Sequence, residues 1–237
     1  GIDGNSYVVN RGDVNNSGYS IALTISPVDT KDIRWTLSTS FSRTINKIEN
    51  NSAADQYELK DFLDGTALVE GKPVGTFYSY KFIGLSPVDG GPLFDDMEDE
   101  KDKLLGQSKY DTYTQVLEAS GRREPIMAGG LNTSMRYKNF RLNASLAYSL
   151  GGKIRLFGMY GQATNSSIDV STIYPERNMD RSIIKRWKKL GDERFTTIPA
   201  IISIASSSYA RYRNHWSKDI AEIQPIANSY WDMYDYS

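Results

Sequence analysis

The sequence predicts an all-β fold whose antiparallel strands form part of a large transmembrane β-barrel. Four segments, at residues 18–26, 33–46, 129–137 and 140–150, alternate large apolar residues with small polar ones. Because successive side chains in a strand point to opposite faces, each segment is predicted to be a strand with one apolar face. The second face carries mainly Ser, Thr and Asn, whereas a strand facing bulk water usually carries Lys and Glu. This composition favours an enclosed, wet lumen, with the apolar face turned to lipid.

The first two strands form a predicted hairpin. Leu23 and its apolar neighbours alternate with Ser and Thr, and the stretch from Trp35 to Phe41 repeats the pattern. Pro27 to Asp32 lie between the segments and are rich in turn formers, so we expect a compact turn there. The residues predicted to face lipid, from this hairpin and the next, are Tyr19, Ile21, Leu23, Ile25, Leu37, Leu142 and Leu146.

The last two strands form a second predicted hairpin, joined by Lys138 and Asn139. Asn tolerates the left-handed backbone that tight hairpins require, so we expect Asn139 to adopt it. Strand direction then puts both short turns on one side, and the long stretches 47–128 and 151–230 on the other. Outer-membrane barrels have this asymmetry, with short periplasmic turns and long extracellular loops.

The two long stretches are predicted to be external loop regions with some structure of their own. Val74 to Ile83 have aromatic residues on both faces, which predicts a strand packed on both sides. Residues 86–106 are predicted to be loop, and residues 110–119 a short helix or a strand. Asn178 to Leu190 are predicted to form a short helix that Gly191 ends.

The composition excludes several classes of function. The chain has 237 residues, 39% of them hydrophobic, a formal net charge of −1 and no cysteine, with a mean hydropathy of −0.49. A near-neutral charge argues against nucleic-acid binding, and the lack of cysteine excludes disulfides and thiol nucleophiles. Tyr is abundant, at 16 against 8 Phe, and several aromatic residues lie near strand ends. They fit a girdle at the lipid headgroups, or they follow from the strand propensity of Tyr.

No residues stand out as catalytic, cofactor-binding or metal-binding, so the sequence does not predict an enzyme. The single histidine, His215, has no positioned partner in its aromatic and basic surroundings. The acidic run 95–102 lacks the spacing of an EF-hand loop and is expected to be a solvated loop rather than a calcium site. No glycine-rich phosphate loop is present, and nothing singles out a pair of catalytic carboxylates.

Several stretches, in order along nearly the whole chain, resemble the SusC/RagA-like TonB-dependent outer-membrane transporters. The most specific is Gly71 to Phe82, with the sequence GKPVGTFYSYKF. The others are Asn10–Tyr19, Asp32–Ser38, Asn46–Ile48, Gly121–Pro125, Gly129–Gly130, Tyr137–Phe140 and Arg186–Glu193.

The resemblance implies a barrel of about 22 strands with an N-terminal plug, of which this chain would supply about four strands and two external loop regions. It also implies energy from TonB acting through the plug, a SusD-like surface lipoprotein as partner, and oligosaccharide or peptide cargo. No TonB box, plug or terminal aromatic strand is recognised, so we expect residues 1–237 to be a C-terminal barrel segment of a longer importer in the outer membrane of a Gram-negative bacterium.

The proposed cargo contacts are loop aromatics, because sugars and peptides both stack on aromatic rings. The candidates are Tyr78, Tyr80 and Trp187, each of which also fits a role in packing within the loops. The competing hypothesis is a soluble β-sandwich module that binds carbohydrate or protein, which would also have short alternating strands. The polar second face and the one-sided long loops favour the barrel over the sandwich.

Overall fold

The computed structural model describes residues 12–52, 54–95, 100, 103–104, 106–156, 181–202, 207–208, 234 and 237. The chain forms two compact units. Two of the boundaries between them fall inside strands, β3 (Thr76–Tyr80) and β6 (Leu117–Arg122). The first unit comprises Gly1–Ala54, Gly65–Phe77 and Gly121–Ile154. The second comprises Asp55–Asp64, Tyr78–Ser120 and Arg155–Ser237.

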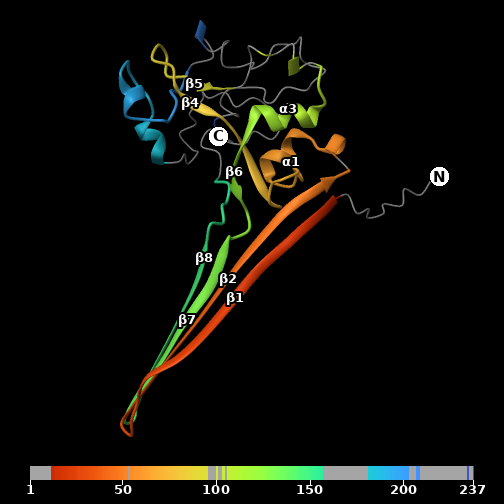
Figure 1. The fold of residues 1–237 in the computed structure, drawn as a ribbon. Helices are drawn as coiled ribbons and strands as arrows, with labels where there is room; N and C mark the ends of the chain where they lie inside the picture. The colour runs from red at the N-terminus through yellow and green to blue at the C-terminus, as the bar shows by residue number, and fades with distance from the viewer. Residues whose placement is uncertain are drawn as a thin grey trace, which may run out of the picture. The chain divides into compact units, whose positions relative to one another are not determined.

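A four-stranded antiparallel sheet in the order β1-β2-β7-β8 dominates the first unit (Figure 1). The strands are β1 (Gly12–Asp29), β2 (Ile33–Asn51), β7 (Met127–Tyr137) and β8 (Phe140–Leu150). Each of the four predicted strands lies within one of these, and β1 and β2 run further than expected. Among the described residues β1 and β8 do not pair with each other, so the sheet is open.

The two turns lie side by side at one end of the sheet, because the backbone N–H of Lys138 donates to Asp32 O at 2.7 Å. The first turn is shorter than expected: β1 continues to Asp29, and Pro27 lies where the register shifts between Ile25 and Val28. Proline lacks the N–H that a regular ladder needs, and a bulge tolerates it. In the second turn the expectation for Asn139 is wrong, since Lys138 is the residue with positive φ, at 53°.

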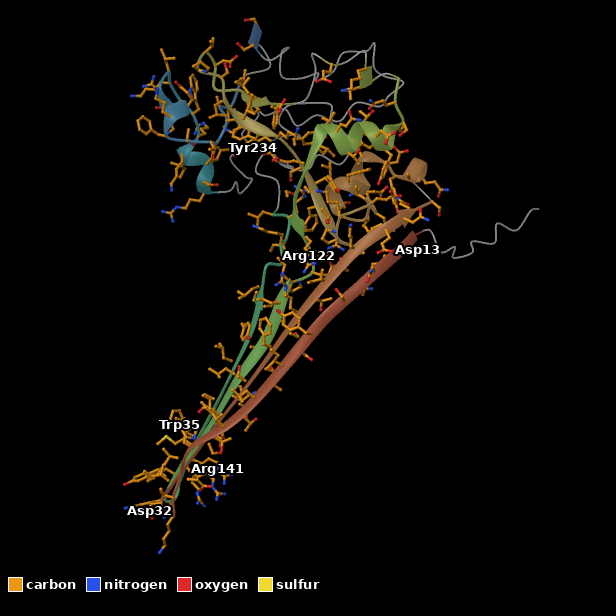
Figure 2. The ribbon with its side chains drawn as sticks, in the orientation of Figure 1. Asp13, Asp32, Trp35, Arg122, Arg141 and Tyr234 are labelled. Atoms are coloured by element: carbon orange, nitrogen blue, oxygen red, sulfur yellow. The ribbon has the colours of Figure 1, made fainter. Side chains whose placement is uncertain are left out.

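A loop packs against the other end of β2. Ile48 is fully buried, and its N–H donates to Lys72 O at 3.0 Å while its carbonyl accepts from Gly71 N–H at 2.8 Å. The guanidinium of Arg122, labelled in Figure 2, donates to Thr44 O at 3.1 Å. The Ile48 hydrogen bonds attach the start of the stretch Gly71 to Phe82 to the sheet. The Arg122 hydrogen bond attaches a second segment to it.

The second unit contains short strands and helices. Strand β3 (Thr76–Tyr80) pairs with β6 (Leu117–Arg122), and β4 (Phe82–Leu85) pairs with β5 (Pro92–Phe94). All five residues of β3 are buried, which confirms packing on both sides for this part of the predicted strand. The prediction of one strand from Val74 to Ile83 is wrong at its end, because Phe82 and Ile83 belong to β4. The helical elements are α1 (Leu59–Asp64), α3 (Lys109–Val116), η1 (Ala54–Gln56), η3 (Arg181–Lys185) and η4 (Asp192–Arg194).

Three expectations for the loop regions need correction. Residues 86–106 include β5, and residues 110–119 are helix and then strand rather than one of the two. The predicted helix over 178–190 is wrong from Arg186 onward, because only the short 3-10 helix η3 forms in the described part. Beyond it, Trp187 N–H donates to Ile198 O, and Lys188 N–H donates to the Asp192 carboxylate. Residues 178–180 lie outside the described part.

Aromatic rings form the core of the second unit around Phe62, which is 0% exposed. Its ring lies 5.4 Å from those of Tyr78 and Tyr113 and 5.6 Å from that of Tyr110, measured between centroids. Helix α3 is held at its start by Ser108, whose hydroxyl accepts from Asp111 N–H, as in an N-terminal capping box. The ring packing joins α1, α3 and β3 in one cluster.

Candidate membrane-facing surface and loop pocket

The register places every large apolar residue of the four predicted strands on one face of the sheet. In one row across the sheet, Leu23 lies opposite Thr39, Thr39 opposite Leu131, and Leu131 opposite Leu146. Although apolar, Leu23 is 54% exposed and Leu142 is 63% exposed. A contiguous exposed apolar face of this kind indicates contact with lipid or with another surface. All seven residues predicted to face lipid lie on this face.

Aromatic residues flank the apolar face at two levels. Near the turns, Trp35 lies opposite Met135, and Tyr137 lies opposite Phe140. At the other level, Tyr19 packs against Phe41 with ring centroids 5.9 Å apart. Eleven residue pairs join β2 to β7 from Ile33 to Arg43, and a transmembrane strand needs about 9–11 residues. The outermost aromatic rows, those of Tyr137 and Tyr19, lie at the two ends of this paired stretch, so the band between them has the length of a membrane-spanning strand.

The opposite face is polar and almost uncharged over most of its length. Its hydroxyls bond across the strands: Thr24 Oγ1 donates to Ser38 Oγ at 3.0 Å, and Ser134 Oγ donates to Asn143 Oδ1 at 2.7 Å. Because these polar side chains hydrogen-bond to one another and to water, water can wet the face although it carries few charges. The one charged row lies next to the turns and contains Asp29, Arg34, Arg136 and Arg141.

A tyrosine covers a glycine between two strands on the apolar face. Tyr148 lies opposite Gly129, and its hydroxyl donates to Ser40 O at 3.2 Å. A Cβ atom on Gly129 would meet the Tyr148 hydroxyl at 2.5 Å. This arrangement fills the space that a glycine leaves in a sheet and hydrogen-bonds the phenol at the same time.

A pocket of about 380 Å³ lies in the second unit and contains Trp187, one of the three predicted contact residues. Its lining combines an indole, charged groups and aliphatic side chains: Asp89, Arg186, Trp187, Lys188, Ala200, Ile201, Ile202 and Ser208. Gly90 fits under the indole ring, where any Cβ atom would collide with it, and has a φ of +70°. Backbone bonds from Trp187 to Ile198 and from Ala200 to Gly90 hold the walls together.

The carboxylate of Glu193 orients the indole of Trp187. It accepts from the indole N–H at 3.1 Å and from Gly191 N–H at 2.8 Å. The backbone N–H of Glu193, the indole N–H and the Gly191 N–H lower the pKa of this carboxyl, and the charge of Arg194 adds to the effect. Hydrogen bonds to the ionised form keep the acceptor charged near neutral pH. The ring is thereby fixed before any ligand arrives.

The two other predicted contact residues are buried. Tyr78 and Tyr80 are each 2% exposed. Tyr78 packs on Phe62, and Tyr80 packs on Phe94 with centroids 6.2 Å apart. Burial, and then the charge of Tyr110, raise the pKa of the Tyr78 phenol far above its usual value. Their position fits the packing role that the sequence also allowed, whereas Trp187 lines the pocket.

The described residues hold no cluster of three or more His, Asp or Glu side chains suited to a metal ion. In the acidic run, Asp95 lies 3.9 Å from the Lys81 ammonium, and Glu100 pairs with Lys103. Residues 96–99 and 101–102 lie outside the described part, as does His215. None of the helices in the described segments is long and apolar enough to cross a membrane.

The pocket partners of Trp187 and the charged row at the turns were not predicted from the sequence. Asp89 and Gly90 lie far from Trp187 in the sequence, and only the folded chain brings them together. The sequence does contain a pattern that predicts the row: Arg34, Arg136 and Arg141 each lie two residues from a short turn. Equal distance from neighbouring turns predicts a common row in consecutive hairpins.

The chain is similar in sequence to one characterised class of receptor. It is 25% identical over 202 residues to "TonB-dependent receptor P3" from Formosa agariphila, a match that covers 75% of this chain. The resemblance to SusC/RagA-like TonB-dependent receptors is confirmed. The chain spans 19% of the length of that relative. No family model matches the chain.

Solved structures show the same fold. The chain is similar to the RagAB peptide transporter, with a TM-score of 0.59 and 20% identity over 82% of this chain and 21% of the other. The "closed-closed" state of the RagAB peptide importer gives a TM-score of 0.56 over 81% of this chain, at 20% identity and with 20% of that chain covered. These matches confirm the predicted fold class, mostly antiparallel strands with few helices.

Proposed function

We propose that this chain is part of an outer-membrane importer that is energised by TonB. The observation that carries the proposal is the exposed apolar face of the sheet, bounded by two aromatic levels and backed by a neutral polar face. Lipid accepts such an apolar face, and an aqueous lumen accepts such a polar face. The receptor and transporter names of the similar proteins support transport rather than enzymatic catalysis.

The exposure of the apolar face also argues against the β-sandwich. In a sandwich the apolar face of a sheet packs on a second sheet and becomes buried. Here residues in the middle of that face, such as Leu23 and Leu146, are more than half exposed. No second sheet covers them among the described residues. A bilayer supplies the missing cover.

In this proposal residues 1–237 form part of one barrel domain, with strands near 18–26, 33–46, 129–137 and 140–150. The stretches 47–128 and 151–230 are external loop regions. A plug and further strands of the longer protein complete the transporter, and TonB acts through the plug. A SusD-like surface lipoprotein is the proposed partner, as the resemblance to SusC/RagA-like transporters implies.

The proposed cargo is an oligosaccharide or a peptide, and Trp187 is the proposed contact in the loops. Its indole lines a pocket together with Arg186 and Lys188, so an aromatic platform lies beside positive charges. Planar peptide groups and sugar rings both pack on such a platform. Tyr78 and Tyr80 remain weaker proposals, because contact with cargo would require them to leave their buried positions.

Uptake by living cells tests this function. The gene is deleted in the source bacterium, and the uptake of labelled peptides and of labelled oligosaccharides is measured with and without the restored gene. We expect uptake of one class to fall in the deletion strain and to return with the wild-type gene. Unchanged uptake of both classes, or recovery of the protein outside the outer-membrane fraction, contradicts the proposal.

Two substitutions at Trp187 test the pocket in the same strain. Trp187→Phe keeps an aromatic surface, although a smaller one, and loses the indole N–H that binds Glu193. Trp187→Ala loses both. We expect the apparent affinity for cargo to fall with Trp187→Ala and to be largely retained with Trp187→Phe, at equal protein levels in the membrane. Equal affinities in all three strains contradict a cargo contact at this residue.

A further inference from the structure

The charged row on the polar face is formed by four residues from four strands. Asp29 lies opposite Arg34, Arg34 opposite Arg136, and Arg136 opposite Arg141. Because neighbouring strands lie about 4.8 Å apart, the three guanidinium groups are neighbours across the sheet. The row lies close to the two turns, where Figure 2 shows Arg141 near Asp32.

The positive charge of this row is not balanced within the described residues. Arg34 donates to the Asp29 carboxylate at 2.9 Å. No ion pair is formed by Arg136 or Arg141 in the described part, although Asp32 lies in the adjacent turn. The next row on this face, Thr36, Ser134 and Asn143, is neutral. Lys31 and Lys138 in the turns add further positive charge.

Like charges directly opposite one another destabilise a sheet. A row of three arginines beside one aspartate is therefore unfavourable unless an anion lies against it. A guanidinium binds carboxylates through two parallel hydrogen bonds. Asp29 shows that one carboxylate fits this row, and two further arginines keep their donors available.

We propose that this row, through Arg136 and Arg141, is a docking site for an acidic polypeptide segment that lies against the polar face next to the turns. Alternate side chains of an extended chain lie on one side about 6.8 Å apart, a spacing that two long arginine side chains in adjacent strands can match. Ser134 donates its hydroxyl proton to the Asn143 side-chain carbonyl, and the Asn143 amide N–H groups are donors that can bond a peptide backbone. The charge complementarity is local and specific to the row.

This inference deepens the proposed function and rests on it in one respect. If the apolar face contacts lipid, lipid headgroups do not reach the polar face, which leaves a polypeptide as the occupant. Nucleic acids require many phosphate contacts, whereas the rows beyond this one are uncharged and the whole chain has a net charge of −1. The occupant is therefore a short run of Asp or Glu side chains.

Binding of a fluorescein-labelled polyglutamate peptide to the intact protein in detergent tests the site by fluorescence anisotropy. We expect the wild type to bind at low salt. Binding should weaken about tenfold or more in the Arg136→Gln/Arg141→Gln variant, because both paired hydrogen-bond donors are lost. The matched control is Lys31→Gln/Lys138→Gln, which removes the same charge from the turns and should weaken binding much less. Arg136→Lys/Arg141→Lys keeps the charge and should lie between them.

Three results overturn the proposal: no binding to the wild type, equal weakening in both double glutamine variants, or displacement of the peptide by inorganic phosphate at equal concentration of charge. The circular dichroism of each variant must match the wild type, and the lysine variant keeps the test valid if a glutamine variant misfolds. Peptide binding is measured without uptake, so its loss leaves the importer proposal standing. Conversely, if gene deletion leaves uptake unchanged while the purified protein binds the peptide, the importer proposal fails and the docking site stands.

Discussion

Single side chains on this sheet are arranged for a solvent other than water. Ile21, Leu23 and Leu142 lie on one face with more than half of their surface exposed, and their sequence neighbours on the other face are Ser, Ala, Thr, Asn and Arg. Removing apolar surface from water stabilises a protein by about 25 cal/mol per Å². Unless lipid covers this face, its apolar surface stays in water and that stabilisation is not gained. A substitution at any residue on the face therefore tests the membrane assignment.

Leu23→Arg is the sharpest substitution on the apolar face. Leu23 lies two rows from the Tyr19 aromatic level, in the middle of the proposed membrane span. We expect the free energy of unfolding to fall by about 2–4 kcal/mol, because a guanidinium near the bilayer centre must be desolvated or must distort the lipid. The measurement is a urea titration of the protein in lipid vesicles.

Thr24→Arg is the matched control, since it places the same charge one residue away on the polar face. It should cost much less, because water is expected there. If the two variants lose equal stability, or if Leu23→Arg loses none, the apolar face does not contact lipid.

Tyr113 gives the second unit a dependence on alkaline pH. Its side chain is buried against Phe62, and burial, followed by the charge of Glu58, raises the pKa of its phenol from 10.0 to about 12. Between these values the unfolded chain loses a proton that the folded chain keeps, so the folded state loses stability as the pH rises. Below pH 10 this contribution is fully present.

The prediction is that the unfolding midpoint in urea falls between pH 10 and pH 12, and falls less in Tyr113→Phe, which has no proton to lose. Near-ultraviolet circular dichroism of the tyrosines follows the transition. An identical fall in wild type and variant assigns the alkaline loss to other groups and contradicts the role of Tyr113.

At the scale of elements, the β7–β8 hairpin is held by a contact between Tyr148 and a glycine. We expect Gly129→Ala to cost about 1–3 kcal/mol of stability, as overpacking of a filled site does, because its Cβ would collide with Ser40 O and the Tyr148 hydroxyl. Thermal unfolding of the folded protein in detergent measures the cost.

The adjacent glycine supplies the control. A Cβ atom on Gly130 would meet its nearest neighbour, Leu146 O, at an ordinary 3.4 Å. Gly130→Ala should therefore be neutral or slightly stabilising, since alanine loses less backbone entropy on folding. Equal destabilisation at both positions would show that the tyrosine cover has no special role.

The elements differ in how well the sequence predicts them, and the difference has a physical cause. The β7 and β8 strands were predicted closely because their two faces meet different surroundings, which imposes a period of two on the sequence. The helix predicted over 178–190 does not continue from Arg186 onward, because the backbone N–H groups of Trp187 and Lys188 bond to Ile198 O and to the Asp192 carboxylate. Nothing in the local pattern encodes those partners.

The candidate sites follow the same rule. Trp187 was one of three loop aromatics proposed because aromatic rings stack on sugars and peptides, and it is the one that lines a pocket. Its pocket was not predicted, because Asp89 reaches it only through tertiary hydrogen bonds such as that of Ala200 N–H with Gly90 O. The charged row required the register of three strand pairs, which the positions of Arg34, Arg136 and Arg141 relative to the turns only suggested.

At the scale of the whole molecule, the apolar face predicts dependence on detergent. We expect the isolated polypeptide to aggregate in plain buffer and to stay in solution, rich in β-structure, only when detergent covers residues such as Leu142 and Leu146. Light scattering and far-ultraviolet circular dichroism measure both properties. A stable, cooperative fold in plain buffer contradicts the membrane assignment and favours a soluble module.

The open sheet has a consequence for preparations of these residues alone. The outer edges of β1 and β8 have no strand partner in the described part of the chain, so each exposes backbone donors and acceptors that detergent does not satisfy. The two edges differ and run antiparallel, and the β8 edge of one molecule therefore suits the β1 edge of the next. Such head-to-tail pairing does not stop at a dimer. We therefore expect oligomers of many different sizes, unless successive molecules curve enough to close a ring.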